Sequence, residues 1–277
     1  MPELPEVETI MRSLRDGGAF GMSIVGKKVS NVEVLWQRSI ALPSVDLFCS
    51  QLTGQTIQAL DRRGKFLLVR FNVDTLLIHL RMSGDLRSEF ISVESPLRTH
   101  DRVIINFTDN SRLVFNDTRK FGRVWLTNDA AQVTGELGPE PFSETLTPVV
   151  LYEMLHRHQR MLKPLLLDQH FMAGLGNIYT DEALFPAGIH PCTLSSSVTM
   201  AQVERLLQAI RKVLNQGIRT NGASIDWVYR GGEFQNHFQV YQRTGEVCAV
   251  CGSSIQRIVV GQRGTHFCPQ CQPLQEV

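Results

Sequence analysis

The chain has 277 residues, which is long enough for two domains with substantial cores. Apolar residues make up 43% of it and charged residues 20%, proportions typical of an ordinary soluble globular protein. It has no uninterrupted run of about 18 apolar residues, which argues against a membrane span. The start is acidic, unlike the basic and then apolar start of a signal peptide, so we expect a cytoplasmic protein.

The net charge of +1 does not by itself indicate a nucleic-acid partner, but phosphates respond to local charge. Basic residues gather in short groups: Arg62, Arg63 and Lys65; Arg98, His100 and Arg102; Arg119, Lys120 and Arg123; Arg157, Arg160 and Lys163. Any one group could be an ordinary solvated surface. Several groups beside Gly turns are less easily explained in that way.

Residues 3–16 are expected to form the first helix. Pro5 suits a first-turn position, and Glu3, Glu6 and Glu8 favour the positive end of the helix dipole. Short β-type runs follow at residues 29–34, 56–61, 66–71, 76–80, 102–107, 112–115 and 123–126. Because turn signals separate these runs, we expect an antiparallel β-sandwich or barrel with flanking helices, within an α+β protein.

A segment rich in Gly and Pro, residues 136–148, is the predicted linker after a first domain at 1–135. Beyond it the apolar period becomes helical, at residues 149–158, 178–185 and 200–216. The apolar stripe of the last of these segments is predicted to be core. We therefore expect a helical domain at 149–235 and a short β-type tail at 236–272.

The tail contains the strongest single motif. Cys248-x2-Cys251 and Cys268-x2-Cys271 are separated by sixteen residues, and two such turns complete a tetrahedral thiolate cage. Zinc is the predicted metal and iron the main alternative, since four-sulfur sites suit both. Four protein ligands close the site, so the metal is expected to be structural. The hairpin between the pairs, with Arg263 near its tip, is either a phosphate-binding finger or a solubilising tip.

Pro2 follows the initiator Met directly, and a small penultimate residue normally permits removal of that Met. The secondary amine thus exposed would have a pKa of about 8, so a useful fraction is unprotonated near neutrality. It can attack the sugar C1′ and form an iminium ion directly, with Glu3 as general acid or base. Taken alone, the same residues are more often just an acidic helix start.

Blocks of sequence along the whole chain match one family. They are Pro2-Glu-Leu-Pro-Glu-Val-Glu-Thr9, Arg62-Arg-Gly-Lys65, His79-Leu-Arg-Met-Ser-Gly84, Asp117-Thr-Arg-Lys-Phe-Gly122, Gly174-Leu-Gly-Asn-Ile-Tyr179 and the four-cysteine finger with Gly-Gln-Arg-Gly. In this order they resemble the formamidopyrimidine-DNA glycosylases. The resemblance implies a β-sandwich, a helix–two-turn–helix domain and a zinc-finger hairpin.

The resemblance also implies an activity: a bifunctional DNA N-glycosylase and abasic-site lyase of base-excision repair. Such an enzyme removes oxidised purines, formamidopyrimidines and 8-oxoguanine, from duplex DNA and nicks the strand by β,δ-elimination. Pro2 would be the Schiff-base nucleophile, Glu3 the proton donor and Glu6 a support of the sugar site. Lys65 would donate a proton for β-elimination, and Arg263 would bind flanking phosphates and assist δ-elimination.

Other residues would contact DNA. Met82, Arg119 and Phe121 match the side chains that fill the gap left by an everted nucleotide, which recovers part of the lost stacking energy. Asn177 at a helix N-terminus, with Lys163 and Tyr179, would grip a phosphate. His100, His158 and Arg160 are further candidates for backbone contacts. We expect one structural Zn2+, a monomer and a nucleoid-associated location.

One departure and three alternatives remain. The stretch 226–239 is shorter than the family's usual loop over the everted base, so Trp227, Tyr229 and Arg230 could substitute by stacking. An endonuclease VIII-like glycosylase for oxidised pyrimidines would share Pro2, Glu3 and the finger. A non-catalytic damaged-DNA-binding relative would keep the scaffold alone. A zinc-ribbon transcription or ribosome-associated factor would explain only the cysteines.

Overall fold

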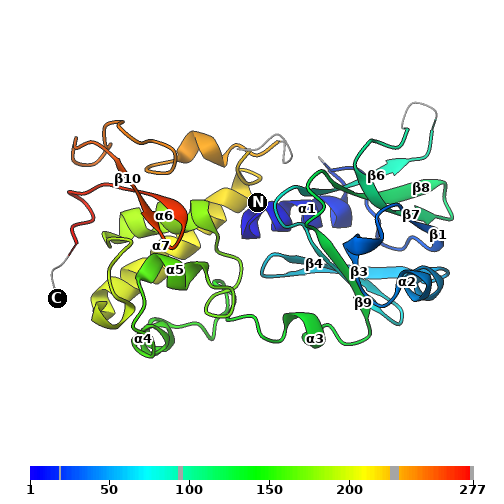
Figure 1. Cartoon of the computed structure of the whole chain (residues 1–277), viewed down its shortest axis with the longest axis horizontal. Helices are drawn as coiled ribbons and strands as arrows, with labels where there is room; N and C mark the ends of the chain where they lie inside the picture. Colours follow the sequence, from blue (N-terminus) through cyan, green and yellow to red (C-terminus); the bar gives the residue numbers. More distant parts are fainter. Residues whose placement is uncertain (19, 93–95, 225–230, 275–277) are drawn as a thin grey trace. The chain divides into compact units, whose positions relative to one another are not determined.

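A computed structural model describes residues 1–277 except 19, 93–95, 225–230 and 275–277. The chain divides into two compact units (Figure 1). The first comprises Met1–Glu136 and Asn221–Gly232, and the second comprises Leu137–Thr220 and Glu233–Val277.

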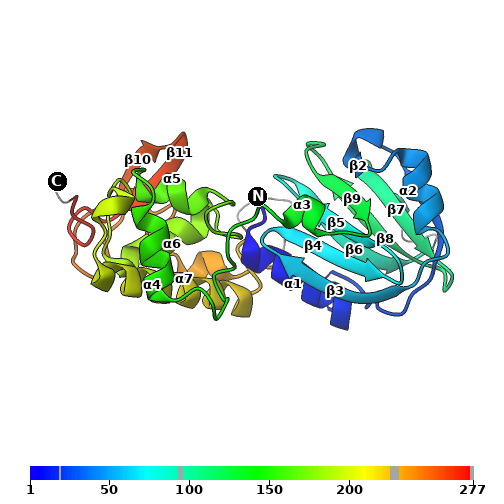
Figure 2. The same cartoon turned by 90° about the horizontal axis from the view of Figure 1, so that it is seen from below.

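The first unit is built mainly of strands. Its elements are α1 (Leu4–Asp16), β1 (Val29–Val34), η1 (Gln37–Ser39), β2 (Ile40–Leu42), α2 (Val45–Leu52), β3 (Ile57–Arg63), β4 (Phe66–Phe71), β5 (Thr75–His79), β6 (Gly84–Phe90), β7 (Asp101–Phe107), β8 (Ser111–Asp117), β9 (Arg123–Thr127) and α3 (Ala131–Thr134). Within the described residues, they form a four-stranded sheet in the order β1-β7-β8-β6 and a five-stranded sheet in the order β2-β9-β5-β4-β3 (Figure 2). Pairing is antiparallel throughout except between β2 and β9.

The core of this unit lies between the two sheets and the first helix. Val7, Ile10 and Leu14 of α1 are fully buried in the same apolar cluster as side chains from both sheets. This helix contacts β3 and β6, each of which is an edge strand of its sheet. The helix therefore covers an open end of the sandwich, and its N-terminus is anchored by packing along its length.

The sequence missed five elements of this unit: η1, β2, α2, β6 and α3. Three of them, η1, β2 and α3, have only three or four residues each. Strand β6 was not predicted because the charged residues Asp85, Arg87 and Glu89 occupy every second position, so the segment has no apolar run. Other strands and α1 agree with the predicted ranges to within two residues.

The second unit is helical with a terminal hairpin. It contains α4 (Pro148–His156), α5 (Leu162–Leu167), α6 (Asn177–Ala187), η2 (Ser195–Ser197), α7 (Met200–Arg219), η3 (Phe234–His237), β10 (Gln256–Val260) and β11 (Arg263–Phe267). Helix α6 contacts α5, α7 and β11, so it is the central element of the unit (Figure 1). The predicted apolar stripe of α7 is buried. None of the helices in the described part of the chain has the length and apolarity needed to cross a bilayer.

One segment groups differently from the prediction. The described residues 221–224, 231 and 232, which the sequence prediction placed in the helical domain, group with the first compact unit. The physical reason is a hydrogen bond of 2.8 Å that the Ala223 backbone N–H donates to Oε1 of Glu6, far away in the sequence. The sequence contains no local signal for such a contact.

Candidate active site

The start of α1 is organised by the carboxylate of Glu6. Its Oε2 accepts the backbone N–H of Glu3 at 2.8 Å, and its Oε1 accepts the backbone N–H of Ala223 at 2.8 Å. Pro2, Glu3 and Glu6 are all buried, although Met1 is exposed. The residue expected to present the amine therefore stands on a fixed helix start and not on a free tail.

Gly222 shows how closely the chain approaches this carboxylate. Its φ is +81°, and an added Cβ would lie 2.6 Å from Oε1 of Glu6. A side chain at this position would push the Glu6 carboxylate away from the N–H groups it holds.

Lys65 lies in the turn between β3 and β4 and is 4% exposed. Two contacts of Arg62 fix this turn: its Nη1 donates to the Gly64 carbonyl at 2.9 Å, and its Nε pairs with Glu8 of α1 at 2.9 Å. Because Arg62 and Glu8 are both largely buried, the turn with Lys65 is held against the helix that begins next to Pro2.

Two loops that carry predicted DNA contacts are joined by the carboxylate of Asp117, which is fully buried. It accepts the N–H of Gly122 at 2.7 Å, the N–H of Arg119 at 3.2 Å and the hydroxyl of Ser83. The hydroxyl oxygen of Ser83 accepts the Arg119 N–H in turn, at 3.0 Å. The loop after β5 and the loop after β8 are therefore one connected structure.

The side chains on these loops point away from the core. Phe121 is 50% exposed, Arg119 is exposed and lies over the Phe121 ring at 5.0 Å, and Met82 is half-buried. Phe121 and Arg119 are therefore presented to solvent together, from a turn whose backbone is fixed by Asp117. The structure thus brings together these three predicted residues.

His79 was quoted in a motif but not predicted as a site residue. It is 7% exposed at the end of β5, and its Nδ1 accepts the Arg81 backbone N–H at 3.0 Å. Burial, with the nearby charges of Arg81 and Lys65, lowers the pKa of His79 to about 3. The ring is therefore neutral at physiological pH, and its remaining proton is on Nε2.

His100 lies next to the Asp117 loop. Its carbonyl accepts the Asp117 N–H at 2.9 Å, and its Nδ1 is 3.2 Å from Nη2 of Arg102. Nε of Arg102 also donates to the Asp117 carbonyl at 2.8 Å. This predicted residue therefore belongs to the same loop cluster as Arg119.

In the second unit, the N-terminus of α6 meets the turn of the β10–β11 hairpin. Asn177 donates its Nδ2 to the carbonyl of Gly264 at 3.1 Å, and Gly264 follows the exposed Arg263 directly. Gly261 and Gln262 both have positive φ, +55° and +63°, and form the tight two-residue turn of the hairpin.

Two predicted contacts are placed differently. The Tyr179 side chain is fully buried and stacks on Phe234 with ring centroids 4.9 Å apart, so it belongs to the helical core. Lys163 is also fully buried and pairs with Asp181 at 2.6 Å. Helical periodicity alone did not reveal that either residue faces inward.

His158 and Arg160 line a shallow cavity of about 210 Å3, together with Arg157, His170 and apolar side chains. Arg160 pairs with Asp168 at 2.9 Å on the wall of this cavity. These two predicted residues are therefore close together on the surface of the second unit.

The four cysteines of the finger converge. Their sulfur atoms all lie within 4.8 Å of one another, with Cys251 and Cys268 at 3.4 Å and Cys248 and Cys271 at 3.9 Å. A tetrahedral zinc with Zn–S bonds of about 2.3 Å separates its sulfurs by about 3.8 Å, so the cage fits the ion. Gly252, at φ +78°, makes the first turn possible.

Comparison with known proteins agrees with this architecture. The chain matches models of the "Formamidopyrimidine-DNA glycosylase N-terminal domain" over residues 1–124, the "Formamidopyrimidine-DNA glycosylase H2TH domain" over 137–228, and the "Zinc finger found in FPG and IleRS" over 245–274.

Relatives and solved structures match over the full length. The chain is 42% identical to the formamidopyrimidine-DNA glycosylase of Enterococcus faecalis, covering 99% of this chain and 98% of that one. A structure of MutM in complex with carbocyclic 8-oxo-G containing DNA has a TM-score of 0.89 and 38% identity, covering 98% of this chain and 100% of that one. The Lactococcus lactis Fpg, solved with an N7-Benzyl-Fapy-dG containing DNA, has the same TM-score, identity and coverage.

The sandwich, the helical domain and the four-cysteine finger together define a zinc-finger DNA glycosylase, an enzyme of base-excision repair. The chain belongs to the formamidopyrimidine-DNA glycosylase family. The α+β fold and the single structural zinc predicted from the sequence are confirmed.

Proposed function

We propose that this chain removes oxidised purines, 8-oxoguanine and formamidopyrimidines, from duplex DNA and then nicks the strand through a Schiff base on Pro2. The proposal rests on the buried start of α1. There the Glu6 carboxylate accepts the backbone N–H groups of Glu3 and Ala223, which fixes the backbone directly after Pro2. A nucleophile held in one geometry attacks far more effectively than a mobile terminus.

In the proposed reaction, the Pro2 nitrogen forms a bond to C1′ as the bond from C1′ to the base breaks. Glu3 donates a proton at the sugar, the ring opens and an iminium ion forms. Loss of a C2′ proton then expels the 3′ phosphate, with Lys65 as the proton donor, and δ-elimination expels the 5′ phosphate. Arg263 binds flanking phosphates during these steps.

The DNA contacts are proposed on the basis of exposure. Met82, Arg119 and Phe121 would occupy the gap left by the everted nucleotide, because they share one rigid, exposed loop cluster. His100, in the same cluster, and His158 and Arg160, at the surface of the second unit, would contact the DNA backbone.

Four further expectations are not tested by the structure. Trp227, Tyr229 and Arg230, expected to stack on the everted base, lie outside the described residues. The monomeric state and the cytoplasmic, nucleoid-associated location stay predictions, as does the division at 1–135, 149–235 and 236–272.

Borohydride trapping on a duplex with one abasic site tests the nucleophile. We expect a covalent adduct that mass spectrometry maps to Pro2, and Pro2→Gly should weaken strand cleavage strongly while largely sparing damaged-DNA binding. Absence of any adduct would leave a binding protein without lyase activity. Unchanged cleavage by Pro2→Gly would refute Pro2 as the nucleophile.

Incision of matched duplexes tests the lesion class. Faster cutting at 8-oxoguanine than at thymine glycol is expected. The reverse order would assign the chain to the glycosylases for oxidised pyrimidines.

A further inference from the structure

Three ionisable side chains meet inside the second unit, each from a different element. Lys163 of α5 and Asp181 of α6 are both fully buried, and Nζ of the first lies 2.6 Å from Oδ1 of the second. His266 of β11 is 8% exposed. Oδ2 of Asp181 accepts its backbone N–H at 2.9 Å and lies 3.3 Å from its Nδ1.

Stability alone is a poor explanation of this cluster. Removing a lysine and an aspartate from water costs several kcal/mol per ion, and an apolar pair of similar volume is often as stable. A buried ion pair does, however, fix its partners in one arrangement, since any shift leaves a charge unpaired. The arrangement that it fixes is the position of β11 against α6.

The same lysine reaches the turn of the hairpin. The carbonyl of Gly264 accepts Nζ of Lys163 at 3.0 Å and Nδ2 of Asn177 at 3.1 Å. Gly264 directly follows Arg263, and His266 lies three residues after Arg263. The backbone that carries Arg263 is thus held at a carbonyl and at an N–H, and Asp181 takes part in both contacts, one of them through Lys163.

We propose that Asp181 is the positioning residue for Arg263. Through Lys163 and His266 it holds the hairpin turn against the N-terminus of α6, so that Arg263 and Asn177 act as one phosphate-binding unit. Zinc fixes the cysteine end of the hairpin, and Asp181 fixes the end with the arginine. This inference rests on the proposed function, in which Arg263 contacts phosphates and assists δ-elimination.

Asp181→Asn tests the proposal in the full-length, zinc-loaded chain. The amide keeps the shape but loses the charge that holds Lys163. We expect one zinc per chain and normal borohydride trapping, with the δ-elimination rate reduced on the order of tenfold to a hundredfold, as for a misplaced catalytic group. The slope of log affinity against log salt should fall by about one, as for one lost phosphate contact.

A double-mutant cycle separates positioning from general damage. If Asp181 acts through Arg263, Asp181→Asn should have no further effect in an Arg263→Ala chain. Glu182→Gln is the matched control, because Glu182 is an adjacent buried carboxylate that holds residues 239–241 instead of the hairpin turn. Its effect should be equal in both backgrounds.

The outcomes are distinct. Where Asp181→Asn loses zinc or unfolds, Lys163→Met combined with Asp181→Leu removes both charges together and should show the same defect and the same dependence on Arg263. If Asp181→Asn slows δ-elimination equally in the chain with Arg263 and in the Arg263→Ala chain, the positioning role is wrong. If Arg263→Ala alone changes neither δ-elimination nor the salt slope, the proposed function is wrong at Arg263 and the inference fails with it.

Discussion

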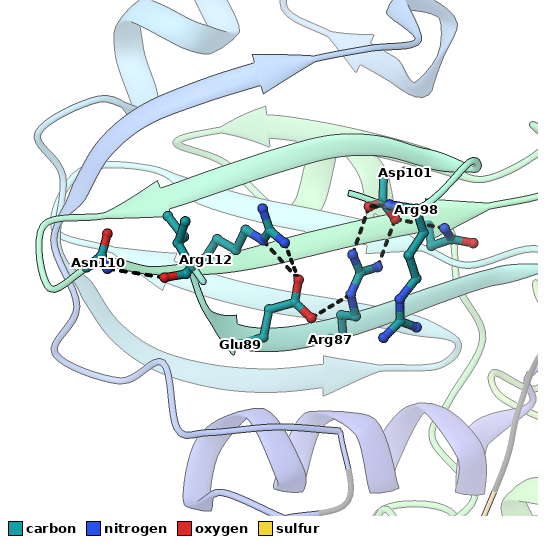
Figure 3. Close-up of polar contacts among 8 residues, drawn as sticks. Arg87, Glu89, Arg98, Asp101, Asn110 and Arg112 are labelled. Carbon is teal, nitrogen blue, oxygen red and sulfur yellow. Dashed lines mark hydrogen bonds and ion pairs between the residues drawn. The ribbon is translucent and has the colours of Figure 1, made fainter. Parts of the chain in front are cut away.

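Buried charges of the first unit show what a single residue contributes. Asp101 accepts a two-pronged contact from Arg87, at 2.8 Å and 2.7 Å, while Glu89 binds both Arg87 and Arg112 on the outer side of the sheet (Figure 3). Burial alone would raise the pKa of Asp101, but hydrogen bonds from Arg87 and Asn116 outweigh it and lower that pKa to about 2.

The pH dependence of stability follows from this shift. Because the folded pKa of Asp101 lies below its unfolded value, its contribution is complete above about pH 5 and is lost as the pH falls towards 2. A shift from 3.8 to about 2 corresponds to about 2 kcal/mol.

Asp101→Asn should therefore flatten the acid limb of the stability curve and lower the free energy of unfolding at pH 7 by about 3–5 kcal/mol, since Arg87 loses its main partner. Urea titrations between pH 2 and 7 measure both effects. Asp61→Asn is the control, because its pair with Arg70 is half-exposed and contributes under about 1 kcal/mol. An equal loss in both variants would contradict the assignment.

At the scale of elements, two short loops are held in fixed positions by side chains that hydrogen-bond to both of them. Neither the loop after β5 nor the loop after β8 has a regular secondary structure of its own, yet Asp117 and Ser83 join them. The start of α1 depends in the same way on Glu6 and residues 221–224.

Asp117→Asn should uncouple the two loops. An amide has only one acceptor oxygen, so one of the buried N–H or O–H groups that Asp117 binds loses its partner. The cost is about 1–3 kcal/mol, which corresponds to roughly fivefold to a hundredfold in rate. We expect excision of 8-oxoguanine to slow by this factor, while cleavage of a preformed abasic site, which has no base to evert, slows much less. Single-turnover kinetics on the two substrates compare them, and equal slowing would exclude a role specific to base eversion.

Gly222→Ala should damage the start of α1. The matched control is Gly26→Ala, since Gly26 has nearly the same φ, +79°, but no atom within 4 Å of an added Cβ. Both variants bear the same backbone strain, and only the first displaces Glu6. Borohydride trapping should fall for Gly222→Ala after correction for stability, and an equal fall in the control would assign the effect to strain alone.

At the scale of the whole molecule, the sandwich and the finger are stabilised in different ways. The first has a large apolar core between its sheets, whereas the finger of the second has a small cluster around the cysteines: Phe185, Val240, Cys248, Ile255 and Cys268. Five side chains are too few to hold a hairpin without the metal.

Removal of zinc should therefore disorder the finger, lower DNA affinity and leave the sandwich folded. Metal release, DNA binding and amide hydrogen exchange measured on one sample test this. Exchange should rise in β10 and β11 and stay low in β4 and β5. Full affinity after verified metal loss would contradict the role of the finger.

The sequence determined the features that depend on local pattern. Alternation of apolar residues predicted most strands, the period of α7 predicted its buried stripe, and the paired cysteines predicted the metal, because each signal repeats within a few residues. Met82 and Phe121, which we propose fill the gap left by an everted nucleotide, were predicted from motifs, since by composition alone they resemble core.

Only the tertiary structure decided which side chains hold these motifs in place. Asp117 and Asp181 act on partners that are distant in sequence, or on backbone N–H groups that any residue supplies. Glu6 was predicted from a motif, but its partner Ala223 was not. The same holds for the inward position of Lys163 and Tyr179, which a helical pattern allows on either face. Long-range hydrogen bonds to the backbone leave no signature in a single sequence, because one partner of each bond is the same in every residue except proline.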